Sequence, residues 1–383
     1  MTASRLVPLG GSLVLGLTAM HHAIVPGIAH AQSVIRFTPS MSATQVYDTN
    51  LFSSAVDPQS DFITRVSPAI DSEYRKPLLS ISGKYTFDIE RFADHVELGS
   101  PSARQHGGLA FSYRPTTRTT FVADADWLTT ETPGELNAAT GLTFTRARAR
   151  RAMGHSSIAR KVTARTSATI DYTLTDDRVA GGLEVLSHLT TARVEHRRSP
   201  RDTVSVDYGF QASMFSAQAP DVLSHRVSIG WTRAITRRVS LSVAGGPRFT
   251  DGSPAPEIAA TASYNGLPVD LSVIYARTQA TVIGVAGAVD TQSLSGAAMW
   301  TLGRSLRARL VPSMFHSDLG GLQARVYRVT VGVARPVAPH LSFDVAFDAS
   351  VQHGTLSAAA PSATIARRDL LISLVAAPTR PVQ

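Results

Sequence analysis

The chain has 383 residues, a length that fits two soluble domains or one large barrel. Hydrophobic residues make up 43% of it, too many for a disordered polymer, and the lack of cysteine excludes a disulfide framework and a thiolate metal site. Lys and Arg total 37 against 29 Asp and Glu, and the net charge of +8 favours anionic partners.

The N-terminus has the pattern of an export signal. Arg5 precedes a mostly apolar stretch at 6–20, and Ala29-His30-Ala31 has the small-x-small spacing of a cleavage site. A membrane anchor is disfavoured because histidines and a proline interrupt the apolar run before it reaches the ~20 residues of a helical span. We expect a signal peptide at 1–31 and one barrel domain at 32–383.

From residue 203 onward, apolar and polar residues alternate. Val204 and Val206 fall on one parity, and Ser205 and Asp207 fall on the other. Successive side chains of a strand point to opposite faces, so this segment predicts a strand with one apolar and one polar face. The same pattern recurs at 79–90 and 341–348, among other segments. Many long strands of this kind, with no helical pattern between them, predict an all-β fold, a transmembrane antiparallel up-and-down β-barrel.

Short turns alternate with longer loops. The short turns carry Pro, Gly, Asn or clustered basic residues, at 75–77, 114–117, 161–163, 198–201, 236–238, 265–266, 303–304 and 336–339. The expected long loops are 48–60, 93–105, 131–141, 176–182, 250–254 and 355–362. In outer-membrane barrels, short turns face the periplasm and long loops face the cell exterior.

The segments between these breaks number about 18, an even count as bacterial barrels require. A first strand near 34–45 and a last strand near 365–375 place both termini in the periplasm. A soluble β-sandwich or β-helix is the alternative, but sandwich strands are usually ~5–6 residues long, whereas these segments alternate for roughly ten. Aromatic residues on the apolar parities fit interfacial girdles, with a buried core as the alternative: Tyr85, Tyr113, Trp127, Tyr208, Trp231, Tyr264, Tyr275 and Trp300.

The segment 47–95 carries the most distinctive motifs. They are Tyr47-Asp48-Thr49-Asn50-Leu51-Phe52, Asp61-Phe62-Ile63-Thr64-Arg65-Val66-Ser67-Pro68, Gly83-Lys84-Tyr85-Thr86 and Arg91-Phe92. They resemble an outer-membrane β-barrel porin family associated with exopolysaccharide production and export. The resemblance implies a pore or export conduit and carries over no catalytic or ligand residue. Such barrels often end in an aromatic residue that the assembly machinery reads, whereas this chain ends in Val382-Gln383.

The sharpest local signal is Arg146-Ala147-Arg148-Ala149-Arg150. If this segment is a strand, its three arginines share one face at a spacing of ~6.5–7 Å. Arginine in lipid near the bilayer midplane costs ~2–4 kcal/mol, so this face should point into the lumen or lie above the membrane. The functional interpretation is a basic ladder for anions. The alternatives are an ordinary solvated wall and an outer rim that contacts anionic surface lipid.

Other charges fall on the lumen parity. The bases are Arg65, Arg226, Arg248, Arg307, Arg309 and Arg328. The acids are Asp71, Glu73, Asp88, Glu90, Asp124, Asp126, Asp207, Asp344 and Asp348. Such charges set up a field across a pore or pair across strands as structural cross-links, and we expect pairing for most of the acids. Arg307 and Arg309 join the arginine ladder as expected lumen contacts.

The sequence contains no strong motif for a catalytic site or a cofactor-binding site. His155, Ser156 and Ser157 are adjacent, but neighbours on a strand face opposite ways and make no nucleophile–base pair. The histidines have no paired metal-ligand spacing, and neither a phosphate loop nor a nucleic-acid-binding pattern occurs in the sequence. We therefore expect no enzymatic activity, cofactor, metal or nucleic-acid partner.

Three functions are considered, in order of preference. The first is an outer-membrane pore or export conduit for exopolysaccharide or other anionic solutes. The second is a structural or surface-interaction barrel that uses its long extracellular loops, and the third is an outer-membrane enzyme. The expected partners are outer-membrane lipid and an anionic polysaccharide or small anions.

Overall fold

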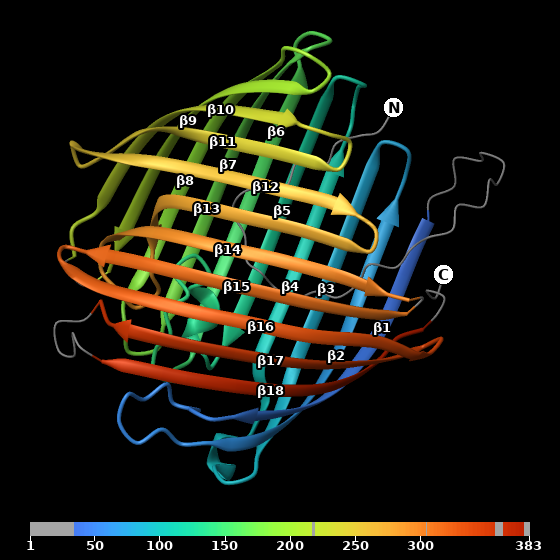
Figure 1. The fold of residues 1–383 in the computed structure, drawn as a ribbon, viewed down its shortest axis with the longest axis vertical. Coiled ribbons are helices and arrows are strands. Elements are labelled where there is room, and N and C mark those ends of the chain that lie inside the picture. Colours follow the sequence, from blue (N-terminus) through green and yellow to red (C-terminus); the bar gives the residue numbers. More distant parts are fainter. Residues whose placement is uncertain (1–33, 217–218, 304, 357–362, 379–383) are drawn as a thin grey trace.

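The computed structural model describes residues 34–216, 219–303, 305–356 and 363–378. The predicted signal peptide lies outside these ranges. The described residues form one closed sheet of 18 antiparallel strands (Figure 1). The strands are β1 (Val34–Asp48), β2 (Asp61–Arg75), β3 (Leu79–Phe92), β4 (Ser100–Tyr113), β5 (Thr119–Thr130), β6 (Ala149–Lys161), β7 (Thr166–Val179), β8 (Glu184–Arg197), β9 (Asp202–Phe215), β10 (Val222–Ala234), β11 (Val239–Thr250), β12 (Ser253–Gly266), β13 (Val269–Thr281), β14 (Ala288–Leu302), β15 (Leu306–Leu319), β16 (Leu322–Ala338), β17 (Leu341–Gly354) and β18 (Thr364–Ala376). Two short 3-10 helices, η1 (Val96–Leu98) and η2 (Pro133–Leu136), lie in loops.

Each strand pairs with its neighbours in sequence, and the first strand pairs with the last. β1 pairs with β2 from Val34 to Asp48, and with β18 from Met41 to Asp48. This closure leaves no open sheet edge, as a barrel in lipid requires, because every backbone polar group must find a partner there. The predicted barrel of about 18 strands is confirmed, and the predicted first and last strands lie within β1 and β18.

The short turns and the long loops lie at opposite ends of the barrel. Three predicted loops are shorter than expected, because strand pairing continues into them. Asp251 and Gly252 both have positive φ, 48° and 83°, and form a two-residue hairpin turn in place of the loop at 250–254. The predicted loops at 93–105 and 176–182 likewise contain residues of β4 and β7. In contrast, the loop at 131–141 extends to residue 148.

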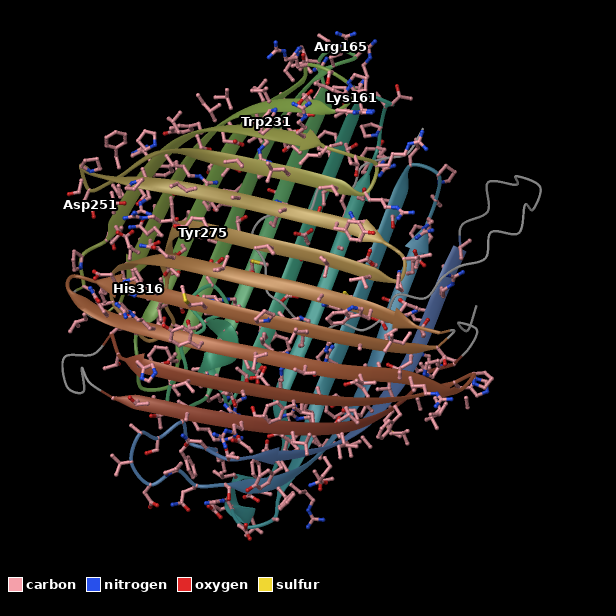
Figure 2. The ribbon with its side chains drawn as sticks, viewed as in Figure 1. Lys161, Arg165, Trp231, Asp251, Tyr275 and His316 are labelled. Atoms are coloured by element: carbon pink, nitrogen blue, oxygen red, sulfur yellow. The ribbon has the colours of Figure 1, made fainter. Side chains whose placement is uncertain are left out.

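The outer face of the barrel is apolar. Val206 on β9 lies opposite Ile229 on β10, and the two are 52% and 64% exposed. At the turn end, the outward rings of Tyr113 and Phe121 stack with centroids 6.4 Å apart, and Trp231 lies near the same end of β10 (Figure 2). A closed barrel with an apolar outer belt and interfacial aromatics is the form in which proteins cross a bacterial outer membrane, and this protein is an outer-membrane barrel.

No helix in the described part of the chain is long and apolar enough to span a membrane.

The outward position of Val206 gives a stability test. Val206→Arg should lower the free energy of unfolding in phospholipid bilayers by ~2–4 kcal/mol, because the charge is forced into hydrocarbon. Ser205→Arg should cost much less, because Ser205 faces the lumen and its hydroxyl already contacts Asp207. Urea unfolding of both variants in vesicles measures the difference. Equal losses at the two positions would contradict the assigned face.

The separation of turns and loops gives a labelling test. The chain has no cysteine, so each introduced thiol is unique. Thr117→Cys and Arg237→Cys lie in turns and should be shielded from an impermeant thiol reagent in intact cells, whereas Val56→Cys and Asp221→Cys lie on the loop side and should react. All four should react after the outer membrane is opened. Labelling of the turn-side pair in intact cells would invert the orientation.

Candidate functional site: the lumen and its crossing loop

Ion pairs between strands line the inner wall. Arg65 on β2 contacts Glu90 at 2.7 Å and Asp88 at 3.7 Å on β3. At the seam between β18 and β1, Arg367 contacts the fully buried Asp48 at 2.8 Å. Further pairs join Arg36 to Glu73, Arg193 to Asp207, Arg226 to Glu257, Arg248 to Asp290, Arg309 to Asp344 and Arg328 to Asp348. The prediction that most lumen acids pair with bases is confirmed, and the wall is close to neutral.

Two histidines extend the polar wall. His106 Nε2 lies 2.8 Å from Asp126 Oδ2, and His155 lies between Asp124 at 2.8 Å and Asp171 at 3.5 Å. Ser156 lies on the opposite parity of β6 from His155. Within the described residues, no group of three His, Cys, Asp or Glu side chains could hold a metal ion.

The loop between β5 and β6, residues 131–148, begins on the β4–β7 side of the barrel. Glu135 accepts a hydrogen bond from Arg104 Nε at 2.8 Å. Arg151 donates to the Leu136 carbonyl at 2.7 Å and to both carboxylate oxygens of the buried Asp177 at 2.7 Å. A guanidinium that is held by a bidentate carboxylate is fixed in place, so it holds the loop backbone against this wall.

The same loop then reaches the opposite wall. Asn137 Oδ1 accepts from the Ile283 amide at 2.9 Å, in the segment between β13 and β14. The Thr143 amide and hydroxyl both donate to Gln352 Oε1 on β17, at 2.9 and 3.1 Å. Because β6 and β15 are opposite in the ring order, residues 131–148 cross the lumen, and Figure 1 shows η2 inside the barrel. We call this segment the crossing loop.

Apolar packing fixes the crossing loop. Leu142 is 1% exposed and belongs to a buried cluster with Val282, Val289 and Val326, and burial of such a side chain contributes ~1.5–3 kcal/mol. Gly141 has φ of 66°, and a Cβ there would lie 2.6 Å from the Phe315 ring of β15. Only glycine combines this φ with this close approach.

The predicted arginine ladder does not form. Arg146 and Arg148 belong to the crossing loop, because β6 begins at Ala149. Arg146 stacks 5.0 Å over the Phe92 ring and contacts Glu90 at 3.6 Å, whereas Arg148 is exposed. Arg150 has the outward parity of Ile158 and contacts Asp176 at 3.3 Å, so its predicted lumen position is corrected.

Arg307 and Arg309 share the lumen parity of β15. Arg307 is exposed near the turn end, and Arg309 lies 3.9 Å from Asp344 on β17. The structure therefore brings these two arginines together on one wall and separates them from Arg146, which lies against β3.

The excess positive charge lies at the turn end. Exposed basic side chains occupy the five successive turns between β2 and β11 or the strand ends beside them, and Figure 2 shows Lys161 and Arg165 there. This set, which we call the turn-side basic ring, is Lys76, Arg114, Arg118, Lys161, Arg165, Arg198, Arg201, Arg237 and Arg238. The described turn residues 76–78, 114–118, 162–165, 198–201 and 235–238 include no carboxylate. The mouth at this end is therefore electropositive, although the wall above it is nearly neutral.

Sequence reasoning missed the crossing loop and the residues that anchor it. The available signal was Leu136, an apolar residue in the predicted solvated loop at 131–141, with Leu142 and Phe144 directly after that loop. The turn-side basic residues were visible, but their charge was interpreted as turn chemistry alone.

No family model matches this chain, and no curated protein matches it. Among solved structures, it is similar to Pseudomonas aeruginosa OpdO, with 10% identity, a TM-score of 0.49, and coverage of 89% of this chain and 97% of that one. It is also similar to Acinetobacter baumannii OccAB4, with 11% identity, a TM-score of 0.48, and coverage of 90% of this chain and 98% of that one. A third similar structure is the siderophore receptor PirA from Pseudomonas aeruginosa, with 9% identity, a TM-score of 0.45, and coverage of 90% of this chain and 80% of that one. These likenesses concern the barrel shape and assign no function.

The anchors of the crossing loop can be tested one at a time. Asn137→Ala removes the acceptor for the buried Ile283 amide, and an unpaired buried donor costs ~1–3 kcal/mol. Hydrogen exchange at 131–148 and 282–287 should accelerate by about tenfold or more, while the strands stay protected. Gln59→Ala removes an exposed contact and should change neither segment. Unchanged exchange in Asn137→Ala would show that this bond does not hold the loop.

Proposed function

We propose that this protein is a passive, non-enzymatic outer-membrane pore that admits anionic solutes through its turn-side mouth. The turn-side basic ring carries this proposal. Fixed positive charge at the mouth of a pore raises the local concentration of anions, over ~8 Å at physiological salt. Rings of charged side chains set ion preference in other pores by the same physics.

The wall supports transit rather than capture. Its arginines are mostly engaged with carboxylates of other strands, so an anion that leaves the mouth meets polar groups without a deep electrostatic trap. Arg307 lies between the basic ring and this paired wall, and we propose that it makes the first lumen contact. Arg309 follows it on the same face of β15.

We further propose an acidic exopolysaccharide as the physiological solute, with small anions as the simpler case. The motifs at 47–95 support the polymer, because they resemble barrels associated with its export. A mouth that is basic on the periplasmic side suits a polyanion that enters from the periplasm. The crossing loop favours a thin, extended chain over a bulky solute, because it divides the lumen near the loop end.

The alternative is a surface-interaction barrel with a closed lumen. The crossing loop is the observation that favours it, because residues 131–148 contact both walls of the lumen. The two functions differ in a direct electrical measurement, since a closed barrel carries no current.

The basic ring predicts anion preference in planar bilayers. The refolded mature barrel should show a reversal potential of anionic sign in a salt gradient, and the preference should fade as salt rises. The quadruple substitution Arg198→Gln, Arg201→Gln, Arg237→Gln and Arg238→Gln should move the reversal potential toward zero without loss of the fold. The matched control is Arg91→Gln with Arg178→Gln, which removes outward charges and should leave the potential unchanged.

Any other outcome of the bilayer measurement contradicts part of the proposal. A folded barrel that carries no current would support the surface-interaction alternative. A pore with cation preference, or one whose preference ignores the quadruple substitution, would exclude the basic ring as the selectivity element.

A further inference from the structure

A row of polar and basic side chains crosses six neighbouring strands on the lipid-facing side of the barrel. Its members lie directly opposite one another in the strand register, from β13 to β18: Arg277, Gln292, His316, Arg325, His353 and Thr364. They share the outward parity of Leu294 and Tyr327, which are 44% and 45% exposed. Figure 2 shows His316 toward the loop end of β15. We call this set the outer row.

The outer row has an unbalanced charge. Within the described residues, neither Arg277 nor Arg325 takes part in an ion pair, and the buried Nδ1 of His316 has no hydrogen-bond partner. The nearest carboxylates in the register, Asp290 on β14 and Asp318 on β15, lie two residues closer to the loop tips. Both are engaged, Asp290 with Arg248 and Asp318 with Gln323. His353 and Thr364 hydrogen-bond to each other at 3.2 Å. The two guanidinium groups of the row therefore present donors without a carboxylate partner beside the apolar belt.

An apolar groove of about 630 Å³ runs parallel to the outer row, on the side away from the loops. Small or short side chains form its floor: Gly296, Pro312, Val329 and Ala349. Larger residues on the next outward positions flank it: Leu294, Met314, Tyr327 and Val351 toward the loops, and Leu310, Val331, Phe347 and Leu370 toward the turns. On β18 the floor position is Arg368, which is exposed.

The groove follows the direction of the cross-strand hydrogen bonds rather than the strands. It begins at Arg368, near the loop end of β18, and reaches Val273, closer to the turn end of β13. Strands of such barrels tilt by ~35–45°, so a line across them is tilted as well. The groove therefore descends from the loop-side boundary of the belt into the depth of the hydrocarbon layer.

We propose that the outer face of β13–β18 binds a phosphorylated, multiply acylated lipid of the leaflet that surrounds the loop end. Arginine binds phosphate oxygens in a bidentate manner, and the outer row offers two such groups, with Gln292 and His316 between them. One acyl chain lies along the groove, and Arg368 contacts the head group at its upper end. A basic row on an apolar belt fits a lipid, because a lipid places phosphate and hydrocarbon side by side in the same order.

Binding of purified lipid A to the full barrel in neutral detergent micelles tests this proposal by native mass spectrometry. We expect a defined complex with one lipid, and Arg277→Gln with Arg325→Gln should weaken it by about tenfold. Ala349→Leu fills the groove floor without a change of charge and should also weaken binding. The control pair Arg91→Gln with Arg178→Gln removes outward loop-side arginines on β3 and β7 and should leave binding unchanged.

Two further binding measurements separate the contribution of the lipid phosphates from that of the acyl chains. Lipid A treated with phosphatase should bind no better than the double arginine variant binds the intact lipid. Phosphatidylglycerol should bind more weakly than lipid A, and equal binding would overturn the assignment to the multiply acylated lipid. Binding that persists in the double variant and in Ala349→Leu, with the heat-modifiable mobility of a folded barrel, would overturn the site itself.

Discussion

Backbone hydrogen bonding in lipid is the constraint on which the whole structure depends. A strand in hydrocarbon has no water to satisfy its amides and carbonyls, so the sheet must close, and here β18 pairs with β1 over Met41–Asp48. Closure assigns one parity of every strand to lipid and the other to the lumen. Val206 and Ser205 are neighbours in sequence, yet they meet hydrocarbon and a polar interior. The location of every charge follows from this division.

Most charges inside the barrel lie in ion pairs, and most of the unpaired basic residues lie elsewhere. Arg65 and Arg367 lie against carboxylates because a half-buried guanidinium without a partner would lose its hydration uncompensated. The basic excess therefore appears where water is plentiful, in the short turns, and at the edge of the apolar belt, in Arg277 and Arg325. The described residues thus carry unpaired basic side chains on two surfaces, the turn-side basic ring and the outer row, beside a wall whose charges are mostly paired.

The alternation of residues predicted the barrel, its strand number and its two ends, because period-two patterning is a local property that survives in any barrel of this size. It did not predict where β6 begins. Arg146, Arg148 and Arg150 alternate as a strand does, but the first two lie in the crossing loop, which is held by contacts such as that of Arg146 with Glu90. Those contacts join residues distant in sequence, and no local pattern encodes them. The outward side of Arg150 follows only from the register of β6 against β5.

The crossing loop also explains where alternation weakens. Near the loop end of β15 and β16, Phe315 and Val326 are apolar although they face inward, because they receive Leu142 rather than water. On the same strands, the intervening positions are His316 and Arg325, which face lipid although they are polar. The usual pattern of apolar outside and polar inside is therefore reversed over a short stretch of neighbouring strands. Apolar residues that face the lumen and polar residues that face lipid each need something to contact. The crossing loop contacts the inward apolar residues, and a phosphorylated lipid fits the outward polar ones.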